Sequence, residues 1–390
     1  MRLIISLALA SLAFAGPAAA NFSSCAANLK NAVVQAGVSN AVASRALDGA
    51  RADEEIVRLS QRQPEFKTPI WDYLGYLVDE QRIEDGLAMM ARYDRVLRAA
   101  EEQFGVNRFV IAAVWGVESN FGQDLGKYFL PHALTVQICQ SARRVEFNRG
   151  ELIAALKLVD RGDLQLDDLY GSWAGAFGQT QFIPSTYQRL AVDFDGDGRR
   201  DLVKSVPDAL ASTANYLRRS GWQPGGSWMI EVKAPDNYKG PTGRKDRASL
   251  STWAQRGIVR ADGKQLAGGA AAGLLLPSGA RGPGFLVFKN FDAIYSYNAA
   301  ESYALAISYL ADRMAGYPPL RTPWPTDDPP LSRAERLHLQ RLLLASGYDV
   351  GEPDGKIGPI TRAAIAEAEK RFGMEPTGRA GGKIYRALGG

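Results

Sequence analysis

The chain has 390 residues, of which 46% are hydrophobic, and its formal net charge is +4. This length and apolar content allow a sizeable core and indicate one large domain with a smaller one. Charges of both signs are mixed along the chain, so no nucleic-acid tail is predicted, although a mildly basic surface suits an anionic polymer. With only His132 and His338 present, a histidine-rich metal site or a serine–histidine triad is close to excluded.

The first twenty residues are typical of a secretory signal peptide. Arg2 supplies one positive charge, residues 3–15 are apolar, and small residues precede a cleavage site that we expect after Ala20. The residues before Cys25 are too bulky and polar for a lipoprotein cleavage box. No later segment is long and apolar enough to span a bilayer. We therefore expect a soluble protein exported to the periplasm, with no membrane anchor.

The two cysteines of the chain are Cys25 and Cys139. An oxidising compartment favours a disulfide between them, and the long closed loop favours stabilisation. The alternative, two buried thiols, stays open because sequence does not establish the geometry.

Helical spacing of apolar residues dominates from Asn21 to about Tyr216, including residues 87–104. Residues 228–233 alternate in polarity and residues 284–288 are a short apolar run between glycines, so both predict strands of a small inserted sheet. Helical spacing resumes after Asn298. Residues 317–330 then contain six prolines, which predict an extended linker between domains.

Glu118 follows nine uncharged, almost wholly apolar residues, 109–117. A helix built from them would be buried on nearly every side. A carboxyl at the end of such a helix loses hydration, which disfavours its ionised form and raises its pKa. A general acid needs that property near neutral pH. The alternative is a helix-end glutamate paired with an arginine.

Two further stretches suggest a carbohydrate site. Residues 171–187 combine small residues with Ser172, Gln181 and several aromatic rings, and small residues let a ligand approach closely. Polar groups suit the hydroxyls and acetamides of a sugar, and aromatic side chains suit its ring faces; a tightly packed loop entering a helix at Pro184 is the alternative. Residues 295–303 space three tyrosines so that several could line one groove, although tyrosines are also common at core edges.

Three ordered blocks of the chain resemble the membrane-bound lytic transglycosylase B family: residues 117–122, residues 175–185, and Tyr297-Asn298 with Tyr303. The resemblance covers most of residues 21–316. It implies a mainly α (α+β) protein, with a goose-lysozyme-like helical catalytic domain that cleaves peptidoglycan and contains the small inserted β region. By this resemblance Glu118 is the only catalytic carboxyl. The residues that would face the glycan are Ser172, Gln181, Tyr216, Tyr297, Asn298, Tyr303 and Tyr73, with Trp71 as a looser match.

A single carboxyl differs from the pair that ordinary glycosidases use. The resemblance implies that Glu118 protonates the oxygen of the β-1,4 bond between MurNAc and GlcNAc, while the 2-acetamido group stabilises C1. Its carboxylate would then accept the C6 hydroxyl proton, giving 1,6-anhydroMurNAc without water and without a catalytic cofactor. The alternatives are a muramidase that uses water, or a non-catalytic cell-wall-binding protein.

Residues 193–201 match the opening of an EF-hand loop, with carboxylates at alternate positions and glycine at the sixth. Lys204 occupies the twelfth position, where a bidentate glutamate belongs, so a longer loop would have to close on Asp208. The resemblance supports a structural Ca²⁺ here, and a polar turn without metal is the alternative. The candidate ligands are Asp193, Asp195, Asp197, Asp201 and Asp208, with the carbonyl of Arg199.

The last sixty residues resemble a small three-helix peptidoglycan-binding domain. Residues 337–344 predict an amphipathic helix, and Pro359 is well placed at the start of another. Ala368-Glu369 replaces the aromatic–glutamine pair usual in the middle helix. We therefore expect a signal peptide (1–20), a catalytic domain (21–316), a proline-rich linker (317–330) and a peptidoglycan-binding domain (331–390), acting on peptidoglycan glycan strands.

Overall fold

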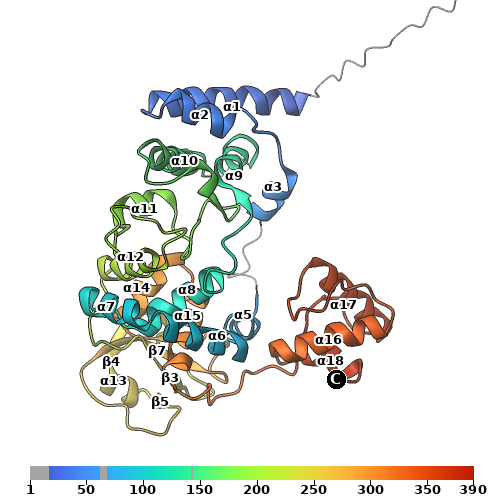
Figure 1. Ribbon diagram of the computed structural model, residues 1–390. Helices are drawn as coiled ribbons and strands as arrows, with labels where there is room; N and C mark the ends of the chain where they lie inside the picture. The colour runs from blue at the N-terminus through green and yellow to red at the C-terminus, as the bar shows by residue number, and fades with distance from the viewer. Residues whose placement is uncertain (1–16, 62–67, 142–143) are drawn as a thin grey trace, which may run out of the picture. The chain divides into compact units, whose positions relative to one another are not determined.

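The computed structural model describes residues 17–61, 68–141 and 144–390, and for residues 17–20 it describes the backbone alone. The protein is mainly helical and has one five-stranded antiparallel sheet, which confirms the predicted fold class (Figure 1). Residues 1–16 of the predicted signal peptide lie outside the described residues, and helix α1 begins at Pro17. In the described part of the chain, every helix is too short or too polar to cross a membrane.

The chain divides into two compact units, each built from separate stretches of sequence. Among the described residues, the first unit takes those up to 61 and those of 125–189, and the second takes 68–124 and 190–390. Glu118 belongs to the second unit, whereas the segment 171–187 belongs to the first. The predicted boundaries at residues 316 and 330 stay predictions.

The first unit is helical. A small core joins Phe22, Ile56, Ala133 and Val136. Its helices are α1 (Pro17–Gln35), α2 (Asn40–Leu47), α3 (Glu54–Ser60), α9 (Leu130–Val136), a π-helical turn (Gln137–Ser141), α10 (Val145–Asp160), a 3-10 turn (Leu166–Asp168) and α11 (Pro184–Leu190). Two short strands, β1 (Tyr128–Phe129) and β2 (Tyr170–Gly171), pair antiparallel.

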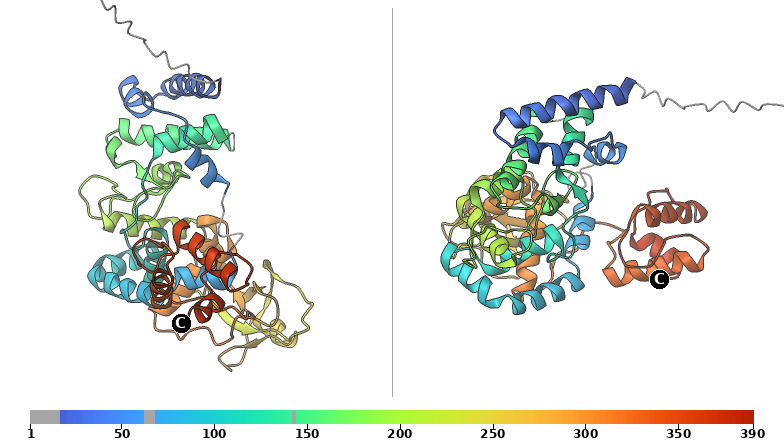
Figure 2. Two further views of the ribbon diagram at one scale, coloured as in Figure 1. Left: turned by 90° about the vertical axis from the view of Figure 1, so that its right-hand side faces the viewer. Right: turned by 45° about the horizontal axis from the view of Figure 1, so that its top comes forward.

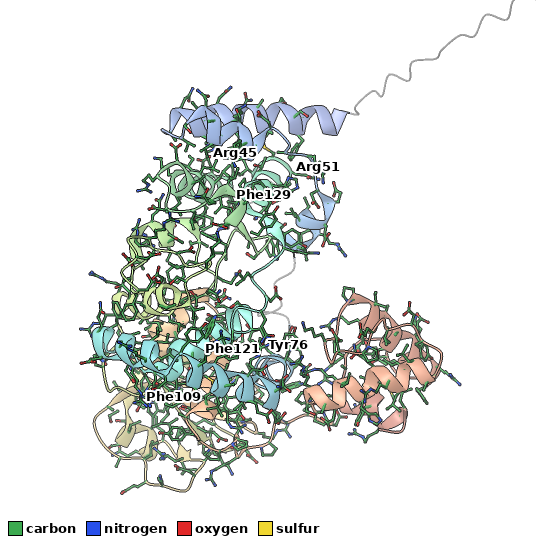
Figure 3. The ribbon with its side chains drawn as sticks, in the orientation of Figure 1. Arg45, Arg51, Tyr76, Phe109, Phe121 and Phe129 are labelled. Carbon is green, nitrogen blue, oxygen red and sulfur yellow. A yellow bond between two sulfur atoms is a disulfide. The ribbon has the colours of Figure 1, made fainter. Side chains whose placement is uncertain are left out.

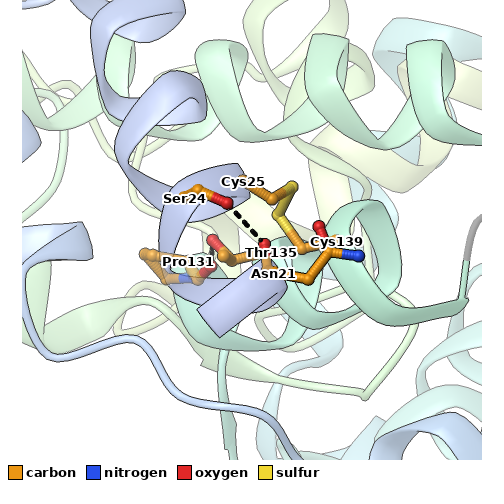
Figure 4. The surroundings of a disulfide bond; sticks show 6 residues. All are labelled: Asn21, Ser24, Cys25, Pro131, Thr135 and Cys139. Atoms are coloured by element: carbon orange, nitrogen blue, oxygen red, sulfur yellow. Dashed lines mark hydrogen bonds between the residues drawn. A yellow bond between two sulfur atoms is a disulfide. The ribbon is translucent and has the colours of Figure 1, made fainter. Parts of the chain in front are cut away.

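A disulfide joins Cys25 of α1 to Cys139 of the π-helical turn, with the two Cα atoms 5.7 Å apart (Figure 4). The bond links positions 114 residues apart in sequence, so it closes a long loop. On one side of it the hydroxyl of Thr135 donates to the carbonyl oxygen of Pro131 over 2.7 Å. The disulfide therefore holds α1 against the α9 region of the same unit.

The core of the second unit surrounds helix α8 (Arg108–Ser119), of which residues 110–116 are all buried. Helix α15 (Glu301–Met314) packs along α8 and is itself buried on most sides. The other helices of this core are α5 (Ile70–Leu77), α6 (Glu80–Arg92), α7 (Asp94–Phe104), α12 (Val206–Arg219) and α14 (Lys289–Asn298). The continuous helical spacing predicted over residues 87–104 is divided at Tyr93, which lies between α6 and α7.

The sheet of the second unit has the strand order β4-β6-β7-β3-β5. The two predicted strands are present as β3 (Met229–Lys233) and β7 (Gly284–Val287), which pair directly. Strands β4 (Gly243–Ser249) and β6 (Ala271–Leu275) were not predicted, because β4 is rich in charged residues and β6 in small residues. The edge strand β5 (Val259–Arg260) and the helix α13 (Leu250–Gln255) complete this region, whose own core includes Trp253.

The C-terminal residues form three helices, as predicted: α16 (Arg333–Ala345), α17 (Pro359–Arg371) and α18 (Gly382–Ala387). They gather into a small bundle, orange to red in Figure 2, around a core that includes Leu339, Leu343 and Ile365. Pro359 is the first residue of α17, where its missing N–H costs no hydrogen bond. Residues 331–390 are called the C-terminal module below.

Candidate active site

Glu118 stands one residue before the end of α8, the most completely buried helix of the second unit. The apolar residues that precede it form the core, as their lack of charge predicts, so the helix has little freedom to move. The guanidinium of Arg82 donates a hydrogen bond to the carbonyl oxygen of Gly116 over 2.9 Å and holds this end of the helix. The Glu118 carboxyl is therefore attached to a rigid helix end, and the residue itself is partly buried.

The turn after Glu118 is made by residues in left-handed backbone conformations. Asn120 and Phe121 have φ values of 50° and 56°, and the Ser119 hydroxyl accepts the Gly122 N–H over 2.9 Å. The ring of Phe121, labelled in Figure 3, is buried and lies edge-on to Trp115 with centres 5.6 Å apart. A Cβ atom at Gly116 would lie 2.5 Å from this ring, so glycine is required there. The ring thereby fixes the backbone just beyond the carboxyl.

Tyr303 of α15 is the hydrogen-bond partner of Glu118. Its hydroxyl donates to Oε1 of the carboxyl, and the side chain is 2% exposed. Burial raises the pKa of Glu118 to about 7, against the opposing effect of this hydrogen bond, which favours the ionised form. Burial, and then the adjacent carboxyl, raise the pKa of Tyr303 well above its usual value, so the phenol stays a donor.

Of the three tyrosines in residues 295–303, Tyr297 and Tyr303 lie together, whereas Tyr295 lines a different cavity. The Tyr297 ring lies parallel to that of Tyr303 with centres 6.4 Å apart, and it meets the Tyr216 ring edge-on at 4.7 Å. The Tyr216 hydroxyl donates to the carbonyl oxygen of Ser296 over 2.7 Å, which ties α12 to α14. The three rings form a continuous aromatic row that begins at the carboxyl of Glu118.

A cavity of about 490 Å³ opens at Glu118. Asn298, Tyr303 and Tyr73, three of the residues that the family resemblance would place against the glycan, line this cavity. Trp71 instead lines a neighbouring cavity of about 980 Å³, together with Tyr295. The first cavity is within the usual size range of small-ligand sites. Its described lining residues are Thr68, Asp72, Tyr73, Gly75, Tyr76, Leu77, Val117, Glu118, Asn298, Tyr303, Pro330, Leu331, Arg336, Ile357, Arg362, Arg379 and Ala380.

Ser172 and Gln181 lie in the first unit, where the predicted loop enters α11 at Pro184. The Ser172 hydroxyl accepts the Ala176 N–H over 3.1 Å, and the Gln181 amide donates to the Gly178 and Leu125 carbonyl oxygens. Both side chains therefore stabilise their own loop, and Gln181 also ties it to Leu125. Their role toward a ligand stays a prediction.

The aspartates of the EF-hand-like loop divide into two groups. Carboxylate oxygens of Asp193, Asp195 and Asp197 all lie within 4.8 Å of one another, close enough to share one cation. Asp208 is fully buried, and its carboxylate accepts backbone N–H groups of Phe194 and Asp201 over 2.7 and 2.8 Å. Asp201 accepts from the N–H groups of residues 203 and 204, and Arg199 is exposed. Hard carboxylate oxygens of this kind suit Ca²⁺.

Sequence reasoning did not find the arginines of the C-terminal module that line the cavity, namely Arg336, Arg362 and Arg379. They are scattered over residues 336–379 and belong to a segment predicted only to bind the cell wall. Two of them could have been found through their carboxylate partners, because a buried arginine needs a counter-charge. Those partners are Asp79 for Arg336 and Asp72 for Arg379, and both are more than 250 residues away in sequence.

Comparisons with known proteins match both the helical part of the chain and its C-terminal module. Residues 21–312 match the transglycosylase SLT domain family, and residues 332–388 match the peptidoglycan binding domain family. The chain is 32% identical over 267 residues to the membrane-bound lytic murein transglycosylase B of Escherichia coli, covering 67% of this chain and 72% of that protein.

Solved structures are similar over most of the chain. SltB3 from Pseudomonas aeruginosa in complex with NAG-anhNAM-pentapeptide is 40% identical, has a TM-score of 0.75, and is matched over 94% of this chain and 99% of that one. The Escherichia coli lytic transglycosylase Slt35 in complex with calcium is 28% identical, with a TM-score of 0.66, matched over 75% of this chain and 92% of that one.

Proposed function

Since this chain belongs to the transglycosylase SLT domain family and is a lytic transglycosylase of peptidoglycan, we propose that Glu118 carries its chemistry as the single catalytic carboxyl. The observation that supports this is the state of the two carboxyls at the cavity. Glu118 has a pKa raised to about 7 by burial, so about half of it is protonated at neutral pH and most of it below neutral pH. Asp72, the other carboxyl among the described lining residues, accepts two hydrogen bonds from Arg379 over 2.5 and 2.6 Å, so both of its oxygens are engaged by that guanidinium.

In the first step, protonated Glu118 donates its proton to the oxygen of the β-1,4 bond between MurNAc and GlcNAc. The bond from C1 of MurNAc to this oxygen breaks, and GlcNAc leaves with a free 4-hydroxyl. The carbonyl oxygen of the 2-acetamido group stabilises the positive charge that develops at C1. The substrate thereby supplies the group that a second carboxylate supplies in ordinary glycosidases.

In the second step, the Glu118 carboxylate accepts the proton of the C6 hydroxyl of MurNAc. The C6 oxygen bonds to C1 and gives 1,6-anhydroMurNAc, and Glu118 returns to its protonated form. Water is not consumed. A residue that serves first as acid and then as base works best with a pKa near the working pH. The hydrogen bond from Tyr303 keeps the carboxyl in one orientation through both steps.

The aromatic row and the neighbouring amide would hold the glycan. Tyr73 and Asn298 line the cavity beside Glu118, and Tyr297 and Tyr216 extend the row away from it. Rings of this kind offer apolar faces to a sugar, while the amide of Asn298 offers both a donor and an acceptor. Ser172 and Gln181 remain proposed glycan contacts on the family resemblance alone.

We further propose that Asp193, Asp195 and Asp197 hold a structural Ca²⁺. Their carboxylates converge, and the related Slt35 has been crystallised with calcium. The ion would neutralise three adjacent negative charges and stiffen a loop that otherwise depends on the buried Asp208. Ca²⁺ has no part in the proposed reaction.

The place of action that fits this chemistry is the periplasm, where peptidoglycan lies and where the Cys25–Cys139 disulfide would persist. The related SltB3 has been crystallised with peptide-bearing fragments of peptidoglycan. By this likeness glycan strands are the partner of the whole chain, and the C-terminal module belongs to a family that binds the same polymer.

Product analysis tests the proposed chemistry. Purified sacculi are digested with the protein, and the soluble fragments are identified by mass spectrometry. We expect fragments ending in 1,6-anhydroMurNAc, and near-complete loss of solubilisation in Glu118→Gln, which retains the shape of the side chain but cannot donate a proton. Reducing MurNAc ends in place of anhydro ends would support a muramidase. Full activity of the Glu118→Gln variant would refute the role of this residue.

A further inference from the structure

The C-terminal module supplies one wall of the cavity at Glu118. Arg336 of α16 is 6% exposed and pairs with the equally buried Asp79 over 2.8 Å. The same guanidinium donates to the carbonyl oxygens of Gly75, Leu331 and Gly355 over 2.8 to 3.1 Å. A buried ion pair is stable only when its remaining hydrogen-bonding groups are also satisfied, as they are here. This arginine therefore fixes the module to the junction of α5 and α6.

A second arginine fixes the module beside the same helix. Arg379 pairs with Asp72 of α5 and also with Asp328 of the linker. Pro330 lies against Gly75, where an added Cβ atom would be 3.0 Å from the proline ring. In Figure 3, Tyr76 is labelled on the side of α5 that faces the module, and the Arg336 guanidinium lies 5.7 Å from the centre of its ring. Both contacts border the cavity that contains Glu118.

The charges of this wall leave one arginine without a carboxylate. Arg336 is balanced by Asp79, and Arg379 by Asp72 and Asp328. Arg362 of α17 lines the cavity, is exposed, and takes part in no ion pair with the residues that the structure describes. In the protonated form that the first step requires, Glu118 carries no charge to offset it. Among the described residues that line the cavity, Arg362 is therefore the one arginine without a carboxylate partner.

We propose that Arg362 binds a carboxylate of the peptide stem carried by the MurNAc residue at Glu118, so that the C-terminal module selects peptide-bearing glycan. This inference rests on the proposed function. The stem is attached to the lactyl group of the sugar whose bond is cleaved, so its carboxylates enter the site with that sugar. The planar fork of a guanidinium matches a carboxylate, and such charge-assisted hydrogen bonds are stronger than neutral ones.

Kinetics on two soluble substrates test the proposal. One is a set of glycan chains with intact stems, and the other is the same set after an amidase has removed the stems. We expect Arg362→Ala to lower kcat/KM about tenfold on the stem-bearing chains, the range of one hydrogen bond to a charged group, and to change it less than twofold on the stripped chains. Arg362→Lys should retain part of the preference. Equal effects on both substrates, or no effect on either, would overturn the proposal.

Arg371→Ala is the matched control, because Arg371 ends the same helix, is exposed and does not line the cavity. It removes the same charge and should leave kcat/KM on both substrates unchanged. A second measurement does not depend on catalysis: calorimetric binding of a disaccharide pentapeptide to the Glu118→Gln protein should weaken about tenfold on adding Arg362→Ala. If the wild-type protein releases no anhydro ends, the proposed function fails. If the wild-type protein releases anhydro ends but Arg362→Ala leaves binding of the disaccharide pentapeptide unchanged, only this inference fails.

Discussion

Tyr303 donates its phenolic hydrogen to Oε1 of Glu118 although the two residues are 185 positions apart in sequence. The contact joins α8 to α15, the two most buried helices of the second unit. Two opposed influences act on the acid: burial favours the neutral carboxyl, and the phenol favours the carboxylate. Their balance leaves a pKa of about 7, which a residue needs if it is to give up a proton and then accept another.

The pH dependence of cleavage follows from this value. The first step requires protonated Glu118, so kcat/KM should fall as the pH rises through about 7, by tenfold per pH unit at higher pH. Initial rates on soluble glycan chains between pH 4 and pH 9 measure it. A fall centred near 4.5, the usual value for glutamate, would show that burial does not govern this carboxyl.

Tyr303→Phe removes the group that stabilises the carboxylate. Since the lost hydrogen bond lowers the pKa of Glu118, the descending limb of the pH profile should move to higher pH. The maximal rate should fall by about tenfold, because the carboxyl loses its fixed orientation.

Tyr309→Phe is the control for that variant. Tyr309 lies on the same helix, and its hydroxyl accepts the N–H of Leu320 away from the cavity lining. Tyr309→Phe should leave the descending limb of the pH profile at the same pH as in the wild type. If the pH profile of Tyr303→Phe coincided with that of the wild type, Tyr303 would not influence the pKa of Glu118.

Glu118 could be predicted because its signal is local: an uncharged segment becomes a buried helix, and the carboxyl at its end loses water. The three C-terminal helices and the strands β3 and β7 could also be predicted from local sequence signals. The partner of Glu118 was predicted only as a residue facing the glycan, because nothing near Tyr303 in sequence indicates which helix it meets. Strands β4 and β6 were missed because their pairing, and not their composition, makes them strands.

The arginines at the cavity are a clearer case of contacts that a single sequence does not predict. Arg336 and Arg379 are defined by carboxylates 257 and 307 residues away, and a single sequence does not contain such pairings. The sequence did place Asp208 with the EF-hand-like loop. It could not indicate that this side chain accepts backbone N–H groups, which depends on the loop folding back over α12.

The stability of the protein should depend on two carboxyls with raised pKa values. Burial raises the pKa of Asp312 to about 7 as well, opposed by the hydrogen bond from the Trp228 ring nitrogen over 2.9 Å. A carboxyl whose folded pKa exceeds its unfolded one stabilises the fold fully below the unfolded pKa, and this contribution is lost as the pH rises toward the folded value. The loss should therefore occur between about pH 4 and pH 7.

Glu118→Gln and Asp312→Asn should each stabilise the protein at pH 8 by ~1–3 kcal/mol, with little gain at pH 4. Each amide keeps an oxygen that can accept the existing hydrogen bond. Urea unfolding at both pH values measures the difference. Asp312→Asn should retain activity, since Asp312 is not among the described residues lining the cavity, so stability and catalysis separate in this pair. Equal effects at pH 4 and pH 8 would contradict the assigned pKa values.

Calcium should raise the melting temperature of the protein, and a chelator should reverse the rise. Asp195→Asn should abolish the rise because it removes one of the three converging charges, while leaving the rate of cleavage within twofold. Calorimetric scans with calcium and with chelator provide the measurement. The same melting temperature in both would argue against a cation in this loop.

Asp208→Ala serves as the contrasting variant for the loop. Its carboxylate is fully buried and accepts backbone N–H groups on both arms of the loop. Leaving those partly buried donors without an acceptor costs up to about 1–3 kcal/mol for each. The melting temperature should therefore fall with or without calcium. If the fall appeared only with calcium, Asp208 would be a ligand, as its place in the sequence first suggested.

Asp79→Asn should release the C-terminal module. The amide can still cap α6 through its oxygen, as Oδ1 of Asp79 does by accepting the Arg82 N–H over 2.9 Å, but it leaves the buried Arg336 without a counter-charge. Breaking one side of a buried ion pair costs about 3–5 kcal/mol. Limited proteolysis within residues 317–330 should become faster, and the preference for stem-bearing glycan should fall.

Asp94→Asn is the control for this variant. It breaks an exposed ion pair with Arg98 and should alter neither the rate of proteolysis nor the preference for stem-bearing glycan. Combining Asp79→Leu with Arg336→Met leaves no buried charge unpaired, so proteolysis should be slower than in Asp79→Asn. Equal rates in these two variants would contradict the unpaired Arg336 charge as the cause of the release.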